Sequence, residues 1–375
     1  MTRGSTGLRL RGLIRKETFQ IVRDPSSILI GFVLPVVLLL LFGYGVSLDA
    51  KHVPMALVIE NPTAETSSFA ASLAGSEYFA PQAVPDRPAA ERALAEGRVQ
   101  AIVVLSSNFS RQLPSAAGAP IQLIVNGTDA NTARIIGGYV EGAWQKWLEH
   151  TALDAGGAMA PPVAVEQRVW FNPEVSSRNF LVPGLMAIIM TLIGTLLTAL
   201  VVAREWERGT LEALMVTPVS IGEILLGKLI PYFVLGMGGM AASTIMAVWV
   251  FGVPFRGSFF VLLLVSTLFM LAALGLGLLI STVTKNQFVA GQVAILVAFL
   301  PAFMLSGFLF DIASMPTVVW GITHVVPARY FVSSLQTLFL AGNIWSIVAT
   351  DMAALALMAA FFLGLTRRKT RKSLE

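Results

Sequence analysis

Long apolar runs dominate the pattern of hydrophobic and polar positions along this chain of 375 residues. Each run supplies the roughly 20 apolar residues that a helix needs to cross the hydrocarbon core of a bilayer. Six runs qualify, at residues 28–48, 180–203, 229–252, 259–280, 288–310 and 344–365. We therefore expect an α-helical integral membrane protein with six transmembrane helices, numbered here as spans one to six.

A stretch of ordinary mixed composition, residues 49–178, separates the first two spans. Short aliphatic runs in it predict buried strands at 54–60, 100–105 and 121–126. Patterns with helical period lie at 64–74, 86–97 and 130–150. Because strands and helices alternate, this stretch predicts a compact α/β domain inserted between spans one and two.

The segment before span one, residues 1–27, predicts a basic amphipathic helix that lies on the membrane lipids. Its apolar positions share one helical face: Leu10, Leu13, Ile14 and Ile21. Asp24 and Pro25 then provide an N-cap residue followed by a first-turn proline, which predicts the start of span one.

Charge placement predicts the orientation. The chain is 55% hydrophobic and only 13% charged, whereas a typical soluble domain is about 25% charged. Lys and Arg concentrate in residues 1–27 and in the tail 366–375, so the positive-inside rule places both ends in the cytoplasm. The inserted domain is then extracytoplasmic, and the basic ends need no nucleic-acid partner to explain them.

The remaining links are short. Residues 204–228 form a cytoplasmic loop, and the half-apolar link 311–343 predicts short re-entrant helices in the outer leaflet. Pro301 predicts a kink in span five. Small residues on span three predict close helix packing: Gly236, Gly238, Gly239 and Ala242.

Residues 222–229, GEILLGKL, match the phosphate-binding pattern G-x-x-x-x-G-K-[ST] at every position but the last. That loop needs its glycines before the helix begins, so that free backbone N–H groups surround the phosphates. Here Ser220 and Glu223 have capping-box spacing, which starts the helix before Gly222. The motif therefore predicts the beginning of span three, with Lys228 snorkelling to the membrane surface.

Few other patterns suggest an enzyme. The chain has no cysteine, and its three histidines are scattered without metal-ligand spacing. Asp351 is the one charge inside a predicted span, and it is either a helix-packing contact or a pathway residue. Ion-driven transporters normally hold carboxylates near the membrane midplane, so the near absence of such groups argues against that class.

The loop between spans two and three carries charges at helical spacing. Glu205, Arg208 and Glu212 fall on one face at i, i+3 and i+7, which predicts the ion pairs Glu205–Arg208 and Arg208–Glu212. Thr217 and Pro218 end this helix. The spacing alone also fits a solvated helix end.

The segment 204–232, REWERGTLEALMVTPVSIGEILLGKLIPY, resembles the signature of the type-2 ABC-transporter permease family. KETFQIVRDPSSILI at 16–30 resembles the connecting helix and first span of that family. NQF at 286–288, LSGFLF at 305–310 and PARYF at 327–331 are similarly placed around span five. The long insert resembles a bacterial subgroup of half-size drug-efflux permeases that work with a periplasmic adaptor.

The resemblance implies two sets of functional residues. A coupling helix that docks on a separate ATPase subunit would contain Arg204, Glu205, Glu207, Arg208, Gly209, Thr210 and Glu212. Spans two and five would line the substrate pathway, with candidates Met186, Met190, Thr191, Thr195, Phe303, Met304 and Phe308.

The resemblance also implies a working assembly. This chain would bind no cofactor itself, and the partner ATPase would hold ATP and Mg²⁺. A second permease subunit, in a homodimer or a heterodimer, would complete an exporter of hydrophobic or amphipathic compounds in the bacterial inner membrane. The alternative is a membrane sensor whose external domain binds a ligand, although such a protein normally carries a cytoplasmic output domain.

The topology is open to a direct test. Single cysteines introduced at Ser67 and Ser373 should differ in labelling by an impermeant thiol reagent on intact cells. We expect labelling at Ser67 alone, because the basic ends are retained in the cytoplasm. Labelling at Ser373 but not at Ser67 would invert the proposed orientation.

Overall fold

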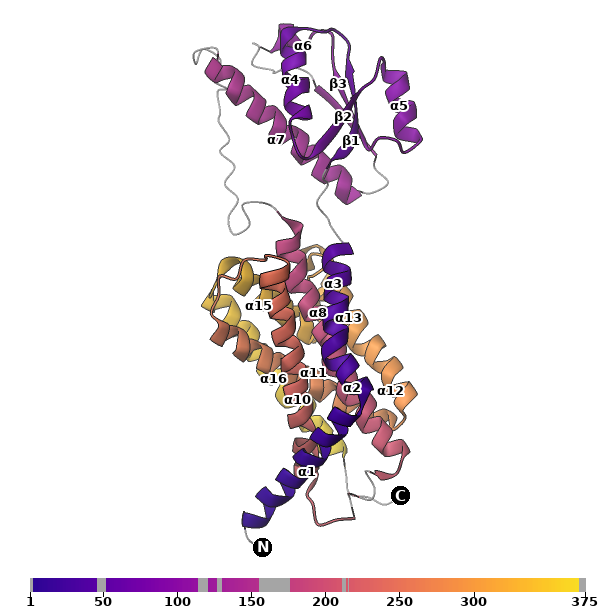
Figure 1. Ribbon diagram of the computed structural model, residues 1–375, viewed down its shortest axis with the longest axis vertical. Helices are drawn as coiled ribbons and strands as arrows, with labels where there is room; N and C mark the ends of the chain where they lie inside the picture. Colours follow the sequence, from indigo (N-terminus) through magenta and orange to yellow (C-terminus); the bar gives the residue numbers. More distant parts are fainter. Residues whose placement is uncertain are drawn as a thin grey trace. The chain divides into compact units, whose positions relative to one another are not determined.

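The chain folds into two compact units, Met1–Ser47 with Val169–Glu375 and Leu48–Arg168. The computed structural model describes residues 3–45, 52–113, 121–126, 130–154, 176–210, 214 and 216–370. The first unit is a bundle of long helices, and the second is a small sheet with helices (Figure 1).

Six helices among the described residues are long and apolar enough to cross a membrane, at Pro25–Gly45, Ser177–Glu207, Ile221–Val250, Phe259–Thr284, Gln287–Leu305 and Trp345–Lys369. They confirm the six predicted spans. The largest difference in bounds is in span three, which begins at Ile221 and not at residue 229. The capping box of Ser220 and Glu223 sets this start, because each side chain accepts a hydrogen bond from the backbone N–H of the other.

Each span consists of one or more helical segments. Spans two, four and six are the single helices α8 (Ser177–Glu207), α11 (Phe259–Thr284) and α16 (Trp345–Lys369). Span three is α10 (Ile221–Ile245) with the π-turn η2 (Met246–Val250). Span one is α2 (Pro25–Ile28), η1 (Leu29–Val33) and α3 (Leu34–Gly45), and span five is α12 (Gln287–Ala294), η3 (Ile295–Phe299) and α13 (Leu300–Leu305).

A π-turn precedes the proline in both interrupted spans. η1 ends two residues before Pro35, and η3 ends two residues before Pro301. Proline has no N–H to donate, and its ring clashes with the carbonyl one turn earlier. A wider turn relieves that conflict. A π-turn thus accompanies Pro301, and the kink predicted there stays a prediction.

Span two is the central helix of the bundle. Within its most apolar stretch of 18 residues, 83% of α8 is buried. The corresponding share is 22–61% in the other five spans. Close backbone contacts hold the neighbouring helices together. A Cβ at Gly277 of α11 would lie 2.3 Å from the carbonyl oxygen of Thr195, and one at Gly239 of α10 would lie 2.4 Å from that of Gly31. The second contact confirms the close packing predicted for span three.

Short helices fill the link between spans five and six. They are η4 (Ile312–Ser314), α14 (Thr317–Thr323), α15 (Pro327–Gln336) and the π-turn η5 (Thr337–Ala341). Their helical character agrees with the prediction, and their place in the outer leaflet stays a prediction.

The α/β unit contains a four-stranded sheet in the order β2-β1-β3-β4. The strands are β1 (Val53–Ile59), β2 (Phe79–Ala83), β3 (Ala101–Leu105) and β4 (Ile121–Val125). β1 runs parallel to both β2 and β3, whereas β4 is antiparallel to β3. β2 was missed by the sequence analysis, since it is a short edge strand interrupted by Pro81.

Both faces of this sheet are covered, as Figure 1 shows. Met55 and Leu57 of β1 pack with α4 (Ala64–Ala74), α6 (Phe109–Gln112) and α7 (Ala130–Asp154). The intervening Ala56 and Val58 pack with α5 (Arg87–Ala95) on the other face. The unit thus buries its own core in a small sheet with helices on both faces. That it forms an extracytoplasmic α/β domain stays a prediction.

Residues 48–168 should fold when expressed alone, because their core is self-contained. Phe69 has an exposed fraction of 0%, and its ring lies 5.4 Å from that of Trp144 and 5.5 Å from that of Trp147. We expect Phe69→Ala to lower the free energy of unfolding by about 3–5 kcal/mol. Denaturant unfolding followed by tryptophan fluorescence would measure it.

Ser67→Ala provides the control, since that side chain is exposed on the same helix. An isolated unit that shows no cooperative transition would mean that its core depends on the bundle.

Candidate functional site: a buried ionic cluster

Four charged side chains from three helices meet at one end of the bundle: Lys16 and Glu17 of α1 (Arg3–Arg23), Glu205 of α8 and Lys228 of α10. Lys228 Nζ lies 3.1 Å from Glu17 Oε1 and also pairs with Glu205 Oε2. Lys16 Nζ lies 2.9 Å from Glu17 Oε1 and 2.8 Å from Glu205 Oε1. We refer to these four residues as the ionic cluster. Its formal charges sum to zero.

Three members of the ionic cluster are almost completely buried. The exposed fractions are 1% for Glu17, 3% for Glu205 and 2% for Lys228. A buried charge costs several kcal/mol in lost hydration, and a close opposite charge offsets that cost. The three side chains can therefore remain buried only while α1, α8 and α10 stay together.

Lys16 closes the ionic cluster on its exposed side. Burial alone would lower the pKa of Lys16, but the hydrogen bonds and charges of Glu205 and Glu17 outweigh that effect and raise the pKa above its ordinary value. Lys16 is therefore charged at neutral pH. Its contribution to stability is fully present there and is lost only as the pH rises through the raised pKa.

The packing of α1 on α10 determines where the cluster forms. Glu17 lies on the face of α1 predicted to be apolar, where Leu13 is half-buried and Ile21 is buried. A Cβ at Gly227 would lie 2.8 Å from the Cβ of Leu13, so the two helices touch beside Lys228. A carboxylate in the middle of an apolar stripe was the sequence signal for this cluster, and the sequence analysis missed it.

A second set of polar contacts joins the ends of spans one, two and five. Arg204 Nη1 lies 3.2 Å from Asp24 Oδ2, and its Nε donates to Gln287 Oε1 at 3.4 Å. Glu207 Oε1 accepts from the backbone N–H of Gln287 at 2.9 Å. Burial alone would raise the pKa of Asp24, but hydrogen bonds from Ser26 and Ser27 and the charge of Arg204 lower it below its ordinary value.

Two predictions about this region are wrong. Lys228 does not snorkel to a surface, since its ammonium is buried between two carboxylates. Glu205 turns inward to Lys16 and Lys228, so the predicted pair with Arg208 gives way to the cluster. An exposed pair on a helix contributes only about 0.3–0.5 kcal/mol, so the stronger buried pairing decides the orientation of Glu205.

The predicted coupling residues occupy different environments. Glu205 is buried and Arg204 is half-buried, whereas Glu207, Arg208 and Thr210 are exposed. α8 ends at Glu207, and Gly209 turns the chain with a φ of 65°. Glu212 lies outside the described residues. Contact of these residues with an ATPase stays a prediction.

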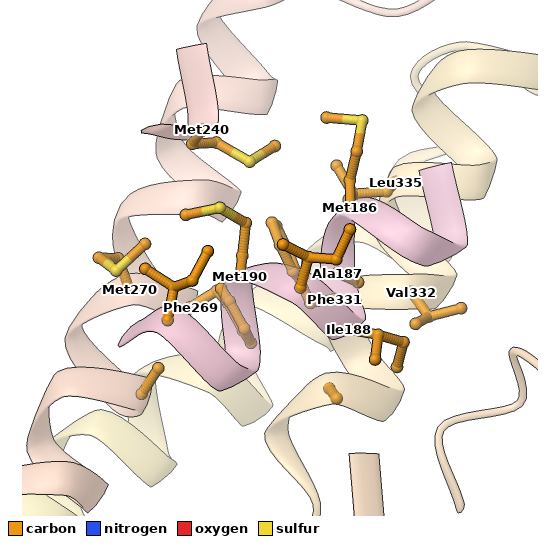
Figure 2. Packing of buried hydrophobic residues seen from close by; sticks show 14 of the residues in the cluster. Met186, Ala187, Ile188, Met190, Met240, Phe269, Met270, Phe331, Val332 and Leu335 are labelled. Atoms are coloured by element: carbon orange, nitrogen blue, oxygen red, sulfur yellow. The ribbon is translucent and has the colours of Figure 1, made fainter. Parts of the chain in front are cut away.

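The predicted pathway residues also divide into groups. Met186 and Met190 are buried in the core of the bundle, where Figure 2 shows them beside side chains such as Met240 and Phe331. Thr191 and Thr195 line an apolar cavity. On the span-five side, Phe303 is half-buried, Met304 is exposed, and Phe308 is buried.

Asp351 has a packing role in this structure. Its exposed fraction is 7%, and its Oδ2 accepts a hydrogen bond from Ser334 Oγ at 3.0 Å. This contact joins α16 to α15. It favours the first of the two alternatives for this residue, a contact between helices.

Lys228→Met should destabilise the bundle, because it leaves two buried carboxylates with Lys16 alone. We expect a loss of about 3–5 kcal/mol in unfolding free energy, measured by denaturation of the purified full-length protein in detergent. Adding Glu205→Gln should recover part of the loss by removing the excess negative charge.

The matched control is Lys285→Met at the same end of the bundle. Lys285 is exposed, with Nζ 4.9 Å from the centre of the Trp206 ring, a contact worth about 0.5–1 kcal/mol. Equal effects of the two Lys→Met changes would contradict a structural role for the ionic cluster.

Comparison with known proteins identifies the family of this chain. The model described as ABC-2 family transporter protein matches residues 25–368. The Escherichia coli (strain K12) protein named "Probable multidrug ABC transporter permease YbhS" is 47% identical over 368 residues, which cover 98% of both chains. A second Escherichia coli (strain K12) protein, "Probable multidrug ABC transporter permease YbhR", is 28% identical over 94% of this chain and 95% of its own length.

A more distant relative also matches over most of both chains. "Linearmycin resistance permease protein LnrN" of Bacillus subtilis (strain 168) is 23% identical over 87% of this chain and 90% of its own length. The family match covers five of the six spans completely, and span six up to its penultimate residue, as well as the inserted α/β unit. This chain belongs to the ABC-2 family of transporter proteins.

Proposed function

We propose that this chain is the permease subunit of an ATP-driven exporter that moves hydrophobic or amphipathic compounds across the bacterial inner membrane. The family match supports the transporter class. Relatives named as multidrug permeases, and one named for linearmycin resistance, support export of such compounds.

The ionic cluster is the structural observation that carries this proposal. It joins α1, the end of α8 and the start of α10. Its residues Glu205 and Lys228 therefore lie near the two ends of the segment that resembles a coupling helix. Buried charges are costly to separate, so a push on this segment would move the ends of spans two and three together with α1. A partner that changes shape as it hydrolyses ATP could thus drive the transmembrane helices.

The segment that nearly matches a nucleotide-binding loop is unsuited to bind a nucleotide, which supports the use of a separate ATPase. Gly222 lies within the first turn of α10, where Ser220 Oγ already accepts from the N–H of Glu223 at 3.3 Å. Lys228, at the position of the phosphate-binding lysine, is committed to Glu17 and Glu205. In this proposal a partner subunit binds ATP and Mg²⁺.

The proposed assembly contains two permease subunits and two ATPases, because six spans form only half of a pathway. Both ends of the chain lie in the cytoplasm, and the α/β unit lies in the periplasm, where it can meet an adaptor protein. In this proposal α1 lies at the cytoplasmic surface of the membrane.

Association with the ATPase offers the most direct test. Arg208 is exposed at the end of α8, directly beside the turn at Gly209. If Arg208 pairs with a carboxylate in a desolvated subunit interface, Arg208→Ala should cost about 2–5 kcal/mol of binding, or at least a 30-fold weaker dissociation constant. Co-purification of the full-length permease with its ATPase and drug-stimulated ATP hydrolysis would measure this loss.

Arg256→Ala is the matched control, because Arg256 is an exposed arginine between spans three and four. Both variants should reach the membrane in normal amounts. Unchanged binding and hydrolysis for Arg208→Ala would place this end of α8 outside the ATPase interface.

A further inference from the structure

A polar cavity of about 780 Å³ lies between the end of span five, the link 311–343 and the start of span six. The volume falls within the range of about 300–1,000 Å³ that is typical of small-molecule sites. Two of its wall residues carry opposite charges, Asp351 of α16 and Arg329 of α15. The cavity therefore offers a ligand both a carboxylate and a guanidinium group.

The carboxylate of Asp351 has no cationic partner. Its exposed fraction is 7%, and its contacts are the hydroxyl of Ser334, which donates to Oδ2 at 3.0 Å, and that of Ser333. Among the described residues, no Lys, Arg or His forms an ion pair with it. Neither carboxylate oxygen is both unpaired and inaccessible. A carboxylate can accept about four hydrogen bonds, so Asp351 retains free positions for a cationic donor.

Arg329 contributes unused donors to the same cavity. Its Nη1 donates to Thr323 Oγ1 and lies 3.0 Å from His324 Nδ1. The guanidinium group carries five N–H donors in all, and Arg329 forms no ion pair within the described part of the chain. Its Nε and Nη2 are accessible. These donors suit the oxygens of a phosphate or carboxylate, which a guanidinium group often binds through two parallel hydrogen bonds.

The two charges thus belong to one cavity without pairing with each other. An ionised carboxylate is costly to bury unless a positive charge lies beside it. Asp311, an exposed wall residue, adds a second carboxylate, so a ligand that is only anionic fits poorly. A ligand with one positive and one negative group provides a partner for Asp351 and for Arg329 at the same time.

The cavity lies near the depth of lipid headgroups. Gln287 begins span five and contacts Glu207 beside the ionic cluster, so the end of span five and the cavity lie at the opposite end of the bundle. Asp351 follows Trp345, the first residue of α16, by six positions, or about 9 Å. Trp320 lines the cavity and is 46% exposed, as expected of tryptophan at a membrane interface.

Exposed apolar side chains favour a lipid over a water-soluble ligand. Leu309 and Phe310 directly precede Asp311 and are 47% and 50% exposed, and Ile322, between wall residues of α14, is 49% exposed. Such side chains suit contact with acyl chains. A small soluble zwitterion would leave them without a partner.

We propose that this cavity binds the headgroup of a zwitterionic phospholipid with a primary ammonium, such as phosphatidylethanolamine, in the leaflet opposite the ionic cluster. The ammonium pairs with Asp351, and the phosphate accepts hydrogen bonds from Arg329. The bound lipid thereby joins α16 to α15. The proposal requires only that spans five and six cross a membrane, and it does not depend on what the chain transports.

Headgroup chemistry provides the first test. Delipidated full-length permease in detergent would be titrated with phosphatidylethanolamine, phosphatidylcholine and phosphatidylglycerol of identical acyl chains, and native mass spectrometry would count the bound lipids. We expect phosphatidylethanolamine to bind at least tenfold more tightly than the other two. A trimethylated ammonium cannot donate a hydrogen bond to Asp351, and phosphatidylglycerol has no positive group. Equal affinities for phosphatidylethanolamine and phosphatidylcholine would overturn the proposal.

Asp351→Asn removes the charge but keeps the size of the side chain and an acceptor for Ser334. We expect its affinity for phosphatidylethanolamine to fall at least tenfold, to that for phosphatidylcholine. The lipid-free variant should be at least as thermally stable as the unmodified protein, because it buries no unpaired charge.

Ser334→Ala is the matched control, because it removes a hydrogen bond to the carboxylate and leaves the charge. Its affinity for phosphatidylethanolamine should stay within about threefold of that of the unmodified protein. If Asp351→Asn also binds the lipid normally, no ammonium meets Asp351 and the proposal fails.

Arg329→Gln tests the phosphate contact independently. It should weaken the binding of all three phospholipids at least tenfold and leave the preference for phosphatidylethanolamine over phosphatidylcholine. Arg256→Gln is the control, because Arg256 is exposed between spans three and four and does not line the cavity. Equal binding by these two variants would contradict the contact of Arg329 with phosphate.

Two further outcomes would replace the lipid with another occupant. If water-soluble glycerophosphoethanolamine binds as tightly as phosphatidylethanolamine, the site takes a soluble zwitterion and the lipid is wrong. If Asp351→Asn and Arg329→Gln leave lipid binding intact but separate the subunits in the same mass spectra, the cavity is a contact between subunits. No ATPase or exported compound enters these measurements, so their failure would leave the proposed function intact.

Discussion

Buried charged side chains need partners of opposite charge, and this requirement determines how the helices pack at one end of the bundle. Lys228 lies between Glu17 and Glu205, and none of the three side chains has appreciable contact with solvent. Separation of α8 or α10 would leave an uncompensated charge in an apolar environment, which costs several kcal/mol, whereas separation of α1 would leave Lys228 with one of its two carboxylate partners. The contact of Leu13 with Gly227 and the capping box that begins α10 bring these charges to their partners.

Central helix α8 connects this end of the bundle to its interior. Glu205 belongs to the ionic cluster, and Thr195 lines the apolar cavity on the same uninterrupted helix. Ten residues separate them, or about 15 Å at the rise of an α-helix. Because α8 is continuous between these residues, a displacement of its charged end reaches the cavity without an intervening hinge.

The two units use different physical solutions to stability. The α/β unit buries both faces of its sheet with its own helices, so its core needs no other part of the chain. The bundle relies on close backbone contacts at glycines and on a few buried polar groups, as expected where lipid surrounds the helices and apolar burial between helices gains little. This division fits the insertion of one unit into a loop of the other.

The sequence by itself determined the six spans, the α/β class of the insert and the family, because these depend on long apolar runs, strand-like runs and a local motif. It also predicted the start of α10, since a capping box needs only residues three positions apart. The strand β2 was missed because Pro81 and an edge position weaken its pattern.

The tertiary structure alone decided which charges are exposed. From the sequence, Glu205 was predicted to form an ion pair with Arg208, and the side chain of Lys228 was predicted to reach the membrane surface. Glu205 is drawn inward by Lys16, which is 189 positions away, and Lys228 by Glu17, which is 211 positions away. Local spacing cannot indicate such a contact, because only the folded bundle brings these helix ends together and makes pairing in a low-dielectric interior stronger than pairing on an exposed helix face.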